Sequence, residues 1–418
     1  MLKRVLFVLL MMPIPVNMLS QVSGYRATYY VDGNKNEEQY RSHTSIESIE
    51  PCASVVYATN GVNLNLMRMR LNKTSGSYNE TDRRETGLNS TLLADAGSKV
   101  LLEYCEVNSH TAQADGVSAS GEGTEVTIQD GSLSMSRAGS AAANATNKAT
   151  ITVIKAKANT FSNQSPVFYT SNEGTMSIDG VMGETTGQAS PLFYSAGDLT
   201  AENCRMSAAR WTVGTVDGGN MYLRKNDLKS GSVCGFLVYG NKTTDASGTL
   251  KLEKNKITVP DGPLFLVTNT QAEITVTNNK FSYKGNVLME VRADDWGVKG
   301  SNGGHATLNL EKQSLNGSIL VDSISSLVLN LKKGGKLKGQ LNAQENRCAQ
   351  VKVVLEAGSA WTSKGDSHLT SIVFNVPVEK GVKQLKGKHT IYYDASDPAN
   401  APLGGKQYKT GGGMLMPE

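Results

Sequence analysis

The sequence predicts an all-β fold, a parallel β-helix, on three observations: a short strand phrase that recurs along the chain, a second phrase between its copies, and no helical period. The 418 residues are 39% apolar and 19% charged, which is too little charge for a disordered chain or a coiled coil. One core runs the whole length of such a solenoid, so no second domain is needed.

The first phrase is a short alternating strand, a polar turn that often contains Asn, and one closing apolar residue. Clear copies are Val126–Leu133, Leu250–Ile257 and Ile274–Phe281. Successive copies are separated by roughly 22 residues or more, as expected for a constant structural turn with loop insertions. The closing residues are Leu71, Val107, Leu133, Phe161, Met182, Met206, Leu228, Ile257, Phe281, Leu315, Leu337 and Trp361, which predicts about 12 turns.

The polar turn supports this prediction. Asn226, Asn255 and Asn279 each lie two residues before a closing residue, where a left-handed conformation would let their amides stack from turn to turn. A propeller or a sandwich would need antiparallel hairpins, and regularly spaced Asn-Gly or Asp-Gly turn signals are missing.

The second phrase predicts a binding surface. Its copies are Ser165–Tyr169, Ser190–Tyr194, Cys234–Tyr239, Gly262–Leu266 and Asn286–Glu290. Alternation places one row on one face, namely Phe168, Phe193, Val238, Phe265 and Met289. The other face carries Tyr169, Tyr194, Tyr239, Leu266 and Glu290. Because only the second row contains a charge, we expect the Phe row to point inward.

The three tyrosines would then form an outward strip that could stack sugar rings or dock another protein. Leu192, Leu237 and Leu264 would extend that strip. The alternatives are that these side chains belong to the core, or that a long loop covers them.

The two ends differ from the repeat. Residues 1–20 have the features of a secretory signal peptide, with Lys3 and Arg4 before the apolar run Val5–Met12 and a cut between about residues 20 and 24. That run is shorter than the roughly 20 residues that span a bilayer, and no other stretch could span one. We expect residues 21–60 to form an N-terminal cap, 61–372 the solenoid, and 373–418 a C-terminal cap and tail with one more strand at Thr390–Tyr393.

Charge and cysteine content exclude further classes. The formal charge of +4 leaves no electrostatic footprint for nucleic acid. Residues 329–418 nevertheless hold 13 Lys and Arg against 7 Asp and Glu, a net +6. This is either a solvated flank or a surface for anionic polymers. The five cysteines are scattered without a CxxC pair, which predicts buried small side chains and neither a disulfide framework nor a metal site.

Several strings resemble a group of exported bacterial right-handed β-helix proteins. They are Val62–Leu66, Asn72–Gly76, Gly262–Thr270, Asp322–Leu331, Ser359–Ser371, Ile391–Ser396 and Leu403–Tyr408. The resemblance implies a pectin-lyase-like fold, export, and a description as adhesin-like or of unknown function, with no catalytic motif to transfer. The chain departs from the group at Asp294 and Asp295, where the loop before Trp296 is usually small and polar.

The chemistry-bearing residues gather in one loop. Enzymes with this fold act mostly on polysaccharides, using acidic Ca²⁺ ligands beside a basic residue or paired carboxylates. Their signature strings do not occur here. The best remaining cluster, in the longest insertion, is Arg292, Asp294, Asp295 and Lys299, with His305 nearby. The simpler interpretation is an exposed loop whose charged members pair with each other or with water.

These observations predict an exported, non-enzymatic, adhesin-like protein that binds a polysaccharide, a surface glycan or a host protein. Its ligand-binding residues would be Tyr169, Tyr194, Tyr239 and Trp296, without metal or cofactor. One alternative is a polysaccharide lyase or glycoside hydrolase whose site is the 292–305 loop, with Ca²⁺ under the lyase version. The other is a structural spacer.

Overall fold

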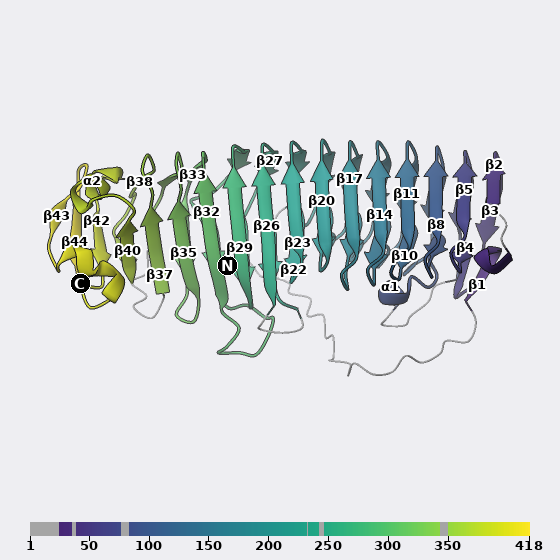
Figure 1. Ribbon diagram of the computed structural model, residues 1–418, viewed down its shortest axis with the longest axis horizontal. Helices are drawn as coiled ribbons and strands as arrows, with labels where there is room; N and C mark the ends of the chain where they lie inside the picture. Colours follow the sequence, from purple (N-terminus) through teal and green to yellow (C-terminus); the bar gives the residue numbers. More distant parts are fainter. Residues whose placement is uncertain (1–24, 36–38, 77–82, 232, 242–245, 343–349) are drawn as a thin grey trace.

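The computed structural model describes residues 25–35, 39–76, 83–231, 233–241, 246–342 and 350–418. The leader predicted in residues 1–20, and Cys348, lie outside these ranges. The strands stack in chain order into one elongated body, with the N-terminal strands at one end and the C-terminal strands at the other (Figure 1). None of the helices in the described ranges has the length and apolarity that spanning a bilayer requires.

Each turn contributes up to three short strands, and equivalent strands of successive turns pair in parallel. The first sheet contains β1 (Arg26–Asp32), β4 (Ala53–Thr59), β7 (Leu92–Ala94), β10 (Val117–Ser120), β13 (Ala143–Thr146), β16 (Phe168–Thr170), β19 (Phe193–Ser195), β22 (Gly214–Asp217), β25 (Phe236–Tyr239), β28 (Phe265–Thr268), β31 (Val287–Val291) and β34 (Ser318–Val321).

The second sheet contains β2 (Gln39–Ser42), β5 (Asn63–Met67), β8 (Lys99–Glu103), β11 (Glu125–Gln129), β14 (Thr150–Ile154), β17 (Thr175–Asp179), β20 (Asp198–Glu202), β23 (Asn220–Arg224), β26 (Ser247–Glu253), β29 (Thr270–Thr277), β32 (Gly304–Glu311), β35 (Ser326–Leu331), β37 (Gln350–Leu355) and β40 (Ser371–Phe374).

The third sheet contains β3 (Ser45–Ser48), β6 (Arg70–Lys73), β9 (Glu106–Ser109), β12 (Ser132–Met135), β15 (Lys157–Thr160), β18 (Met182–Thr185), β21 (Arg205–Ala208), β24 (Asp227–Lys229), β27 (Lys256–Val259) and β30 (Lys280–Tyr283). A fourth sheet contains β33 (Ser314–Asn316), β36 (Lys336–Lys338), β38 (Ala360–Thr362) and β41 (Leu385–Lys386). The fifth contains β39 (Ser367–Leu369), β42 (Thr390–Tyr393), β44 (Met414–Pro417) and β43 (Tyr408–Lys409). The helical pieces are η1 (Gly33–Lys35), α1 (Arg83–Thr86), α2 (Val378–Gly381), η2 (Val382–Gln384) and η3 (Pro398–Leu403).

Alternation explains why these segments form strands with one buried face. In β11 the side chains of Val126 and Ile128 are buried, and both pair in register with Ile151 and Val153 of β14. Like side chains therefore stack along the axis and make one continuous apolar core. The predicted Phe row is part of it, because Phe168, Phe193 and Phe265 are fully buried.

A left-handed residue turns the chain between the second and third sheets. It recurs in successive turns, for example at Lys225, Lys254 and Asn278, with φ between 54° and 55°. The prediction gave this conformation to Asn226, Asn255 and Asn279, which are the next residues along. Their stacking was predicted correctly: the Nδ2 groups of Asn226 and Asn255 each donate to the Oδ1 atom of the next Asn, at 3.0 and 2.9 Å.

Strand pairing corrects the predicted register in two places. Phe236 and not Val238 continues the Phe row, so Leu237 and not Tyr239 lies level with Tyr194. The predicted closing residues Phe161 and Met182 are 44% and 51% exposed. Ala158 and Gly183 occupy those positions in the third sheet. At these two closing positions the true residue is smaller than the predicted one: Ala158 lies three residues before Phe161, and Gly183 directly follows Met182.

The solenoid also begins earlier and has more turns than predicted. In the described residues the second sheet alone has 14 strands, against the predicted total of about 12 turns. Residues 21–60 were assigned to a cap, but β1, β2 and β3 pair in parallel with the following turn and form a complete turn themselves. The strand predicted at Thr390–Tyr393 is β42.

Candidate functional site

The predicted aromatic strip is only partly accessible, since Tyr169 and Tyr194 are half-buried. Tyr169 and Tyr194 stack with their ring centroids 4.7 Å apart, and the Arg84 guanidinium carbon lies 4.8 Å from the centroid of Tyr169. Tyr239 is buried, at 8% exposure, in a small cluster separate from the main core. The leucines expected beside them are buried too, namely Leu192, Leu237 and Leu264.

Hydrogen bonds join two of these tyrosines. The Tyr194 hydroxyl lies 2.6 Å from Asp217 Oδ2 and 3.2 Å from the Tyr239 hydroxyl. Trp296, from the loop at 292–303, packs edge-on against Tyr239 with centroids 5.0 Å apart. Burial raises the pKa of each of Tyr169, Tyr194 and Tyr239. Arg84, Trp296 and the neighbouring tyrosines therefore cover part of each ring, and the predicted strip is half-buried at Tyr169 and Tyr194 and buried at Tyr239.

The charged loop pairs internally. Arg292 Nε lies 2.8 Å from Glu290 Oε2, and Arg292 Nη1 lies 2.7 Å from Asp294 Oδ2. Burial alone would lower the pKa of Arg292, but the hydrogen bonds and charges of Glu290 and Asp294 raise it above its ordinary value. The buried Asn302 amide donates to the backbone oxygens of Asp294 and Trp296, at 2.6 and 2.9 Å, and so holds the loop closed.

The other members of the predicted enzyme site stand apart from this pair. Asp295 and Lys299 are exposed, and His305 Nδ1 lies 2.9 Å from Ser326 Oγ. Among the described residues no three His, Cys, Asp or Glu side chains lie close enough to hold a metal ion. The arrangement is that of the simpler interpretation, a loop whose charges pair with each other.

A different site lies where the third sheet is interrupted. In the described residues β30 is the last strand of the third sheet, and β33 of the next turn begins the fourth sheet without pairing with it. The first and second sheets continue across the same step through β31 with β34 and β29 with β32. The gap opens into a groove of about 1190 Å³.

Gln313 explains why the gap opens. It occupies the turn position that Asn226, Asn255 and Asn279 hold in earlier turns, and it is buried. Between earlier turns the backbone N–H of Lys280 donates to the Asn255 oxygen. At the gap the Gln313 side chain takes that place, accepting from the Asn279 N–H at 2.6 Å and donating to the Asn279 oxygen at 3.2 Å. An amide side chain thus stands where strand pairing would have begun.

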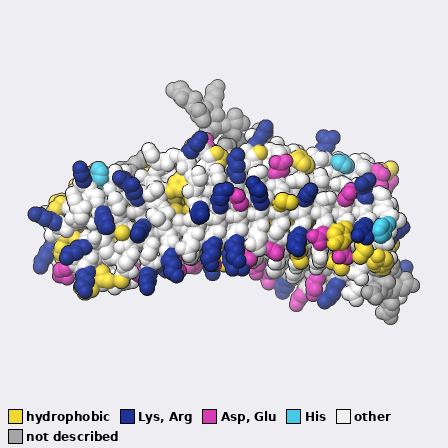
Figure 2. Space-filling view, turned by 90° about the horizontal axis from the view of Figure 1, so that it is seen from above, with side chains coloured by type: hydrophobic (Ala, Val, Ile, Leu, Met, Phe, Trp, Pro, Cys, Tyr) yellow, Lys and Arg dark blue, Asp and Glu magenta, His cyan; other side chains and the backbone are white. Residues whose placement is uncertain are grey.

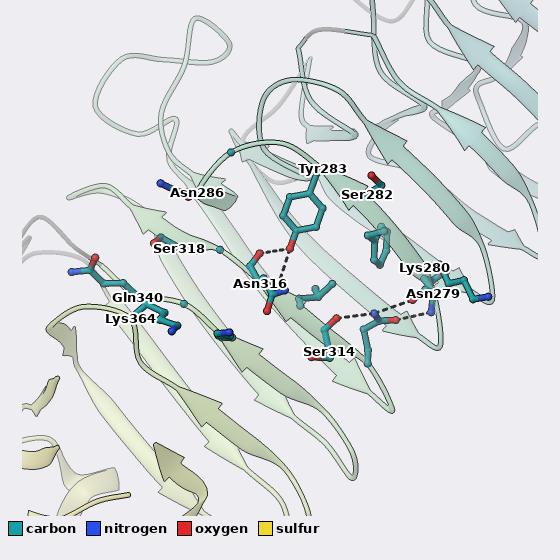
Figure 3. Close-up of a pocket in the computed structure, with 17 residues that line it drawn as sticks. Asn279, Lys280, Ser282, Tyr283, Asn286, Ser314, Asn316, Ser318, Gln340 and Lys364 are labelled. Atoms are coloured by element: carbon teal, nitrogen blue, oxygen red, sulfur yellow. Dashed lines mark hydrogen bonds between the residues drawn. The ribbon is translucent and has the colours of Figure 1, made fainter. Parts of the chain in front are cut away.

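Tyr283 bridges the other end of the gap. Its ring reaches from the end of β30 toward β33, where its hydroxyl donates to the Asn316 oxygen and accepts from the Asn316 N–H (Figure 3). Burial raises the pKa of Tyr283. Because side chains at both ends replace the backbone ladder, the facing edges of β30 and β33 stay apart and the groove persists between them.

The groove is polar and basic. Its lining includes the exposed lysines Lys280, Lys338 and Lys364, and two aromatic residues, Phe281 and Tyr283. Amides and hydroxyls complete it, among them Asn279, Asn286, Asn316, Gln340, Ser282, Ser314 and Ser318. Among the described residues that line the groove, none is Asp, Glu or His. Such a surface can donate hydrogen bonds to hydroxyls and attract anionic groups, but it offers no carboxylate pair for glycoside hydrolysis.

Comparison with known proteins agrees with the architecture. Residues 90–281 match the family model of the right-handed β-helix region. The protein is a right-handed parallel β-helix. No curated protein and no solved structure matches the chain.

Sequence reasoning missed the groove. The long step between Phe281 and Leu315 was attributed to the charged loop at 292–305, whereas the same step also interrupts the third sheet of the β-helix. The available signal was Gln313, which replaces Asn in the turn ladder.

Proposed function

We propose that this protein binds an anionic polysaccharide, without cleaving it, in the groove between β30 and β33. One observation carries the proposal: three exposed lysines converge on a groove whose described lining has no acidic residue. None of Lys280, Lys338 and Lys364 forms an ion pair with a described residue. Their charge is therefore available to the carboxylate or sulfate groups of a ligand.

The rest of the lining suits a sugar polymer. Asn286, Asn316 and Gln340 supply amide groups that can pair with sugar hydroxyls, and Phe281 adds a half-buried ring that could contact a sugar face. The leader-like residues 1–20 support export to the outside of the cell, where such polymers are found. An adhesin-like role, in which the protein holds a surface glycan, follows from this proposal.

Measurements of polymer retention and of polymer cleavage test the proposal together. We would immobilise the mature protein and measure retention of polygalacturonate, chondroitin sulfate and neutral dextran, while assaying new reducing ends and unsaturated products. We expect retention of one or both anionic polymers, no retention of dextran and no products. Changing Lys280, Lys338 and Lys364 together to Gln should remove retention.

A matched variant controls for net charge. Lys35, Lys155 and Lys157 are exposed lysines five or more turns of the β-helix away from β30, and changing all three to Gln should leave retention unchanged. Equal loss in both triple variants would contradict a site at the groove. Product release that disappears in Asp294→Ala or Lys299→Ala would instead establish the enzyme alternative. No retention of any polymer would refute the binding proposal.

A further inference from the structure

The basic surface continues beyond the groove toward the C-terminus. A second hollow of about 430 Å³ lies farther toward the C-terminus, lined by Lys388, Lys409, Thr390, Thr410 and Met414 together with two glycines. Both of its lysines are exposed. Along this face Lys and Arg side chains are spread over the C-terminal half, and Asp and Glu side chains gather toward the N-terminal half (Figure 2).

The two hollows occupy the same corner of successive turns. Asn316 pairs with Lys338, Lys338 with Thr362, and Thr362 with Lys386, so the groove and the strands beyond it are in register. A bridge from Lys386 to Gly411 carries the register to the second hollow. Lys364 of the groove and Lys388 of the hollow thus hold equivalent positions one turn apart.

Glycines make this corner flat. Gly317, Gly339, Gly387 and Gly412 stand there in four of the turns. A Cβ on Gly412 would lie 3.0 Å from the Gly387 oxygen, and one on Gly339 or Gly387 would collide with the backbone of the turn before. The close approach of the turns therefore requires glycine, and in consequence no side chain at these positions rises between the groove and the hollow.

Charge along the corner is uncompensated. Lys386, Lys388 and Lys409 form no ion pair with any described residue. The corner also carries Asp366, whose carboxylate accepts the Thr390 N–H at 2.8 Å and lies 3.8 Å from His389 Nδ1. Four steps of about 4.8 Å each separate β33 from the second hollow, which makes the basic corner about 20 Å long.

We propose that one linear anionic polysaccharide lies along the β-helix axis, with the groove as its first subsite and the hollow of Lys388 and Lys409 as its second. This inference rests on the function proposed above and adds the length and direction of the bound chain. A single sugar would need only the groove. A basic corner that continues over several turns without a rising side chain is matched by a polymer whose charges repeat along its length.

Oligomer length separates the two subsites. We would measure the affinity of galacturonate disaccharide and octasaccharide for the wild type, for the Lys388→Gln/Lys409→Gln variant and for a Lys155→Gln/Lys157→Gln control. In the double variant we expect the octasaccharide to bind about three- to tenfold more weakly, because each lost charge contact contributes a few-fold. The disaccharide should bind as it does to the wild type, and the control should match the wild type for both.

Each of the other outcomes would refute one part of the proposal. Unchanged octasaccharide affinity in the double variant, with binding still lost in the groove triple variant, would refute the second subsite and leave the proposed function intact. Loss of disaccharide binding in the double variant would show that the two hollows are not separate subsites.

Absence of binding by the wild type to either oligomer, and to the corresponding chondroitin sulfate oligomers, would refute the proposed function itself. Equally tight binding of duplex DNA, lost in the same variant, would refute a polysaccharide as the specific partner. Circular dichroism and melting temperature check that every variant is folded.

Discussion

Single residues decide how closely the turns of this β-helix approach one another. Asn255 is one example. Its side chain is buried, accepts from the Asn226 N–H at 2.9 Å and donates to the Leu223 oxygen at 2.7 Å. Gln313 makes a different set of bonds from the same corner and leaves the neighbouring strands unpaired. Gln313 is one methylene longer than the three Asn residues that are stacked before it.

Asn255→Ala should destabilise the fold. The substitution leaves the buried Asn226 N–H without its partner and removes the bonds that the Asn255 amide donates to the Leu223 oxygen and to Asn279 Oδ1, and a buried unsatisfied group costs about 1–3 kcal/mol. We expect a loss of about 3 kcal/mol in the free energy of unfolding. The midpoint of guanidinium denaturation measures it, with the exposed Asn286→Ala as control within about 0.5 kcal/mol of the wild type. An unchanged midpoint for Asn255→Ala would show that the stacked amides do not stabilise the turns.

Lys73 should make stability depend on pH in the alkaline range. The side chain is fully buried and donates to the backbone oxygens of Glu50 and Ala53, and burial lowers its pKa from 10.5 to about 8. Between pH 8 and 10.5 the unfolded chain holds a proton that the folded protein has released, so this residue makes stability rise with pH across that window. The gain is on the order of 3 kcal/mol, since one pKa unit is about 1.4 kcal/mol.

The comparison with Lys73→Met isolates this effect. We expect the difference in unfolding free energy between wild type and variant to shift in favour of the wild type from pH 8 to 10.5 and to level off outside that window. Denaturation curves at a series of pH values measure it. A difference that stays constant with pH would mean that Lys73 keeps its proton in the fold.

At the scale of the strands, the stacked Phe side chains are the clearest source of stability. Phe168 and Phe193 lie with ring centroids 6.1 Å apart, and both are fully buried. Phe193→Ala should cost about 3–5 kcal/mol, because the neighbouring turns cannot collapse into the cavity. Phe161→Ala is the matched control, since that ring is 44% exposed, and it should cost well under 1 kcal/mol. Thermal melting of both variants tests this, and similar shifts would contradict the register described for the first and third sheets.

The sequence could predict those features of the strands that depend on residues a few positions apart. It could not predict those that depend on pairing with another turn. Alternation within a few residues placed Phe168 and Phe193 in the core. It could not align Leu237 rather than Tyr239 with Tyr194, because register is set by pairing with the next turn.

Nor could it show that Arg84 packs against Tyr169 or that Trp296 packs against Tyr239. Arg84 lies far from Tyr169 in the sequence, and no short-range pattern connects them. The groove was missed for a similar reason, since it is formed by an absent strand pairing and not by a motif.

The whole molecule is electrically asymmetric along its axis. Residues 329–418 carry a net +6, whereas residues 21–328 carry −4. We expect the mature protein to be retained on a carboxylate cation exchanger at neutral pH despite its small net charge, through its C-terminal end. Changing Lys338, Lys364 and Lys388 together to Gln should lower the salt concentration of elution more than changing Lys155, Lys157 and Lys229, although both variants lose the same charge. Equal elution shifts would show that retention does not depend on the C-terminal end.

The interruption between β30 and β33 has a mechanical consequence for the whole rod. Elsewhere in the central turns three sheets tie each turn to the next, but at this step only the first and second sheets do so. A load that pulls the two ends of the molecule apart is carried at this plane by the ladders of the first and second sheets, supplemented by the bonds of Gln313 and Tyr283. If the protein tethers two surfaces, the segment that holds the glycan therefore begins at a plane where two sheets, and not three, transmit the tension.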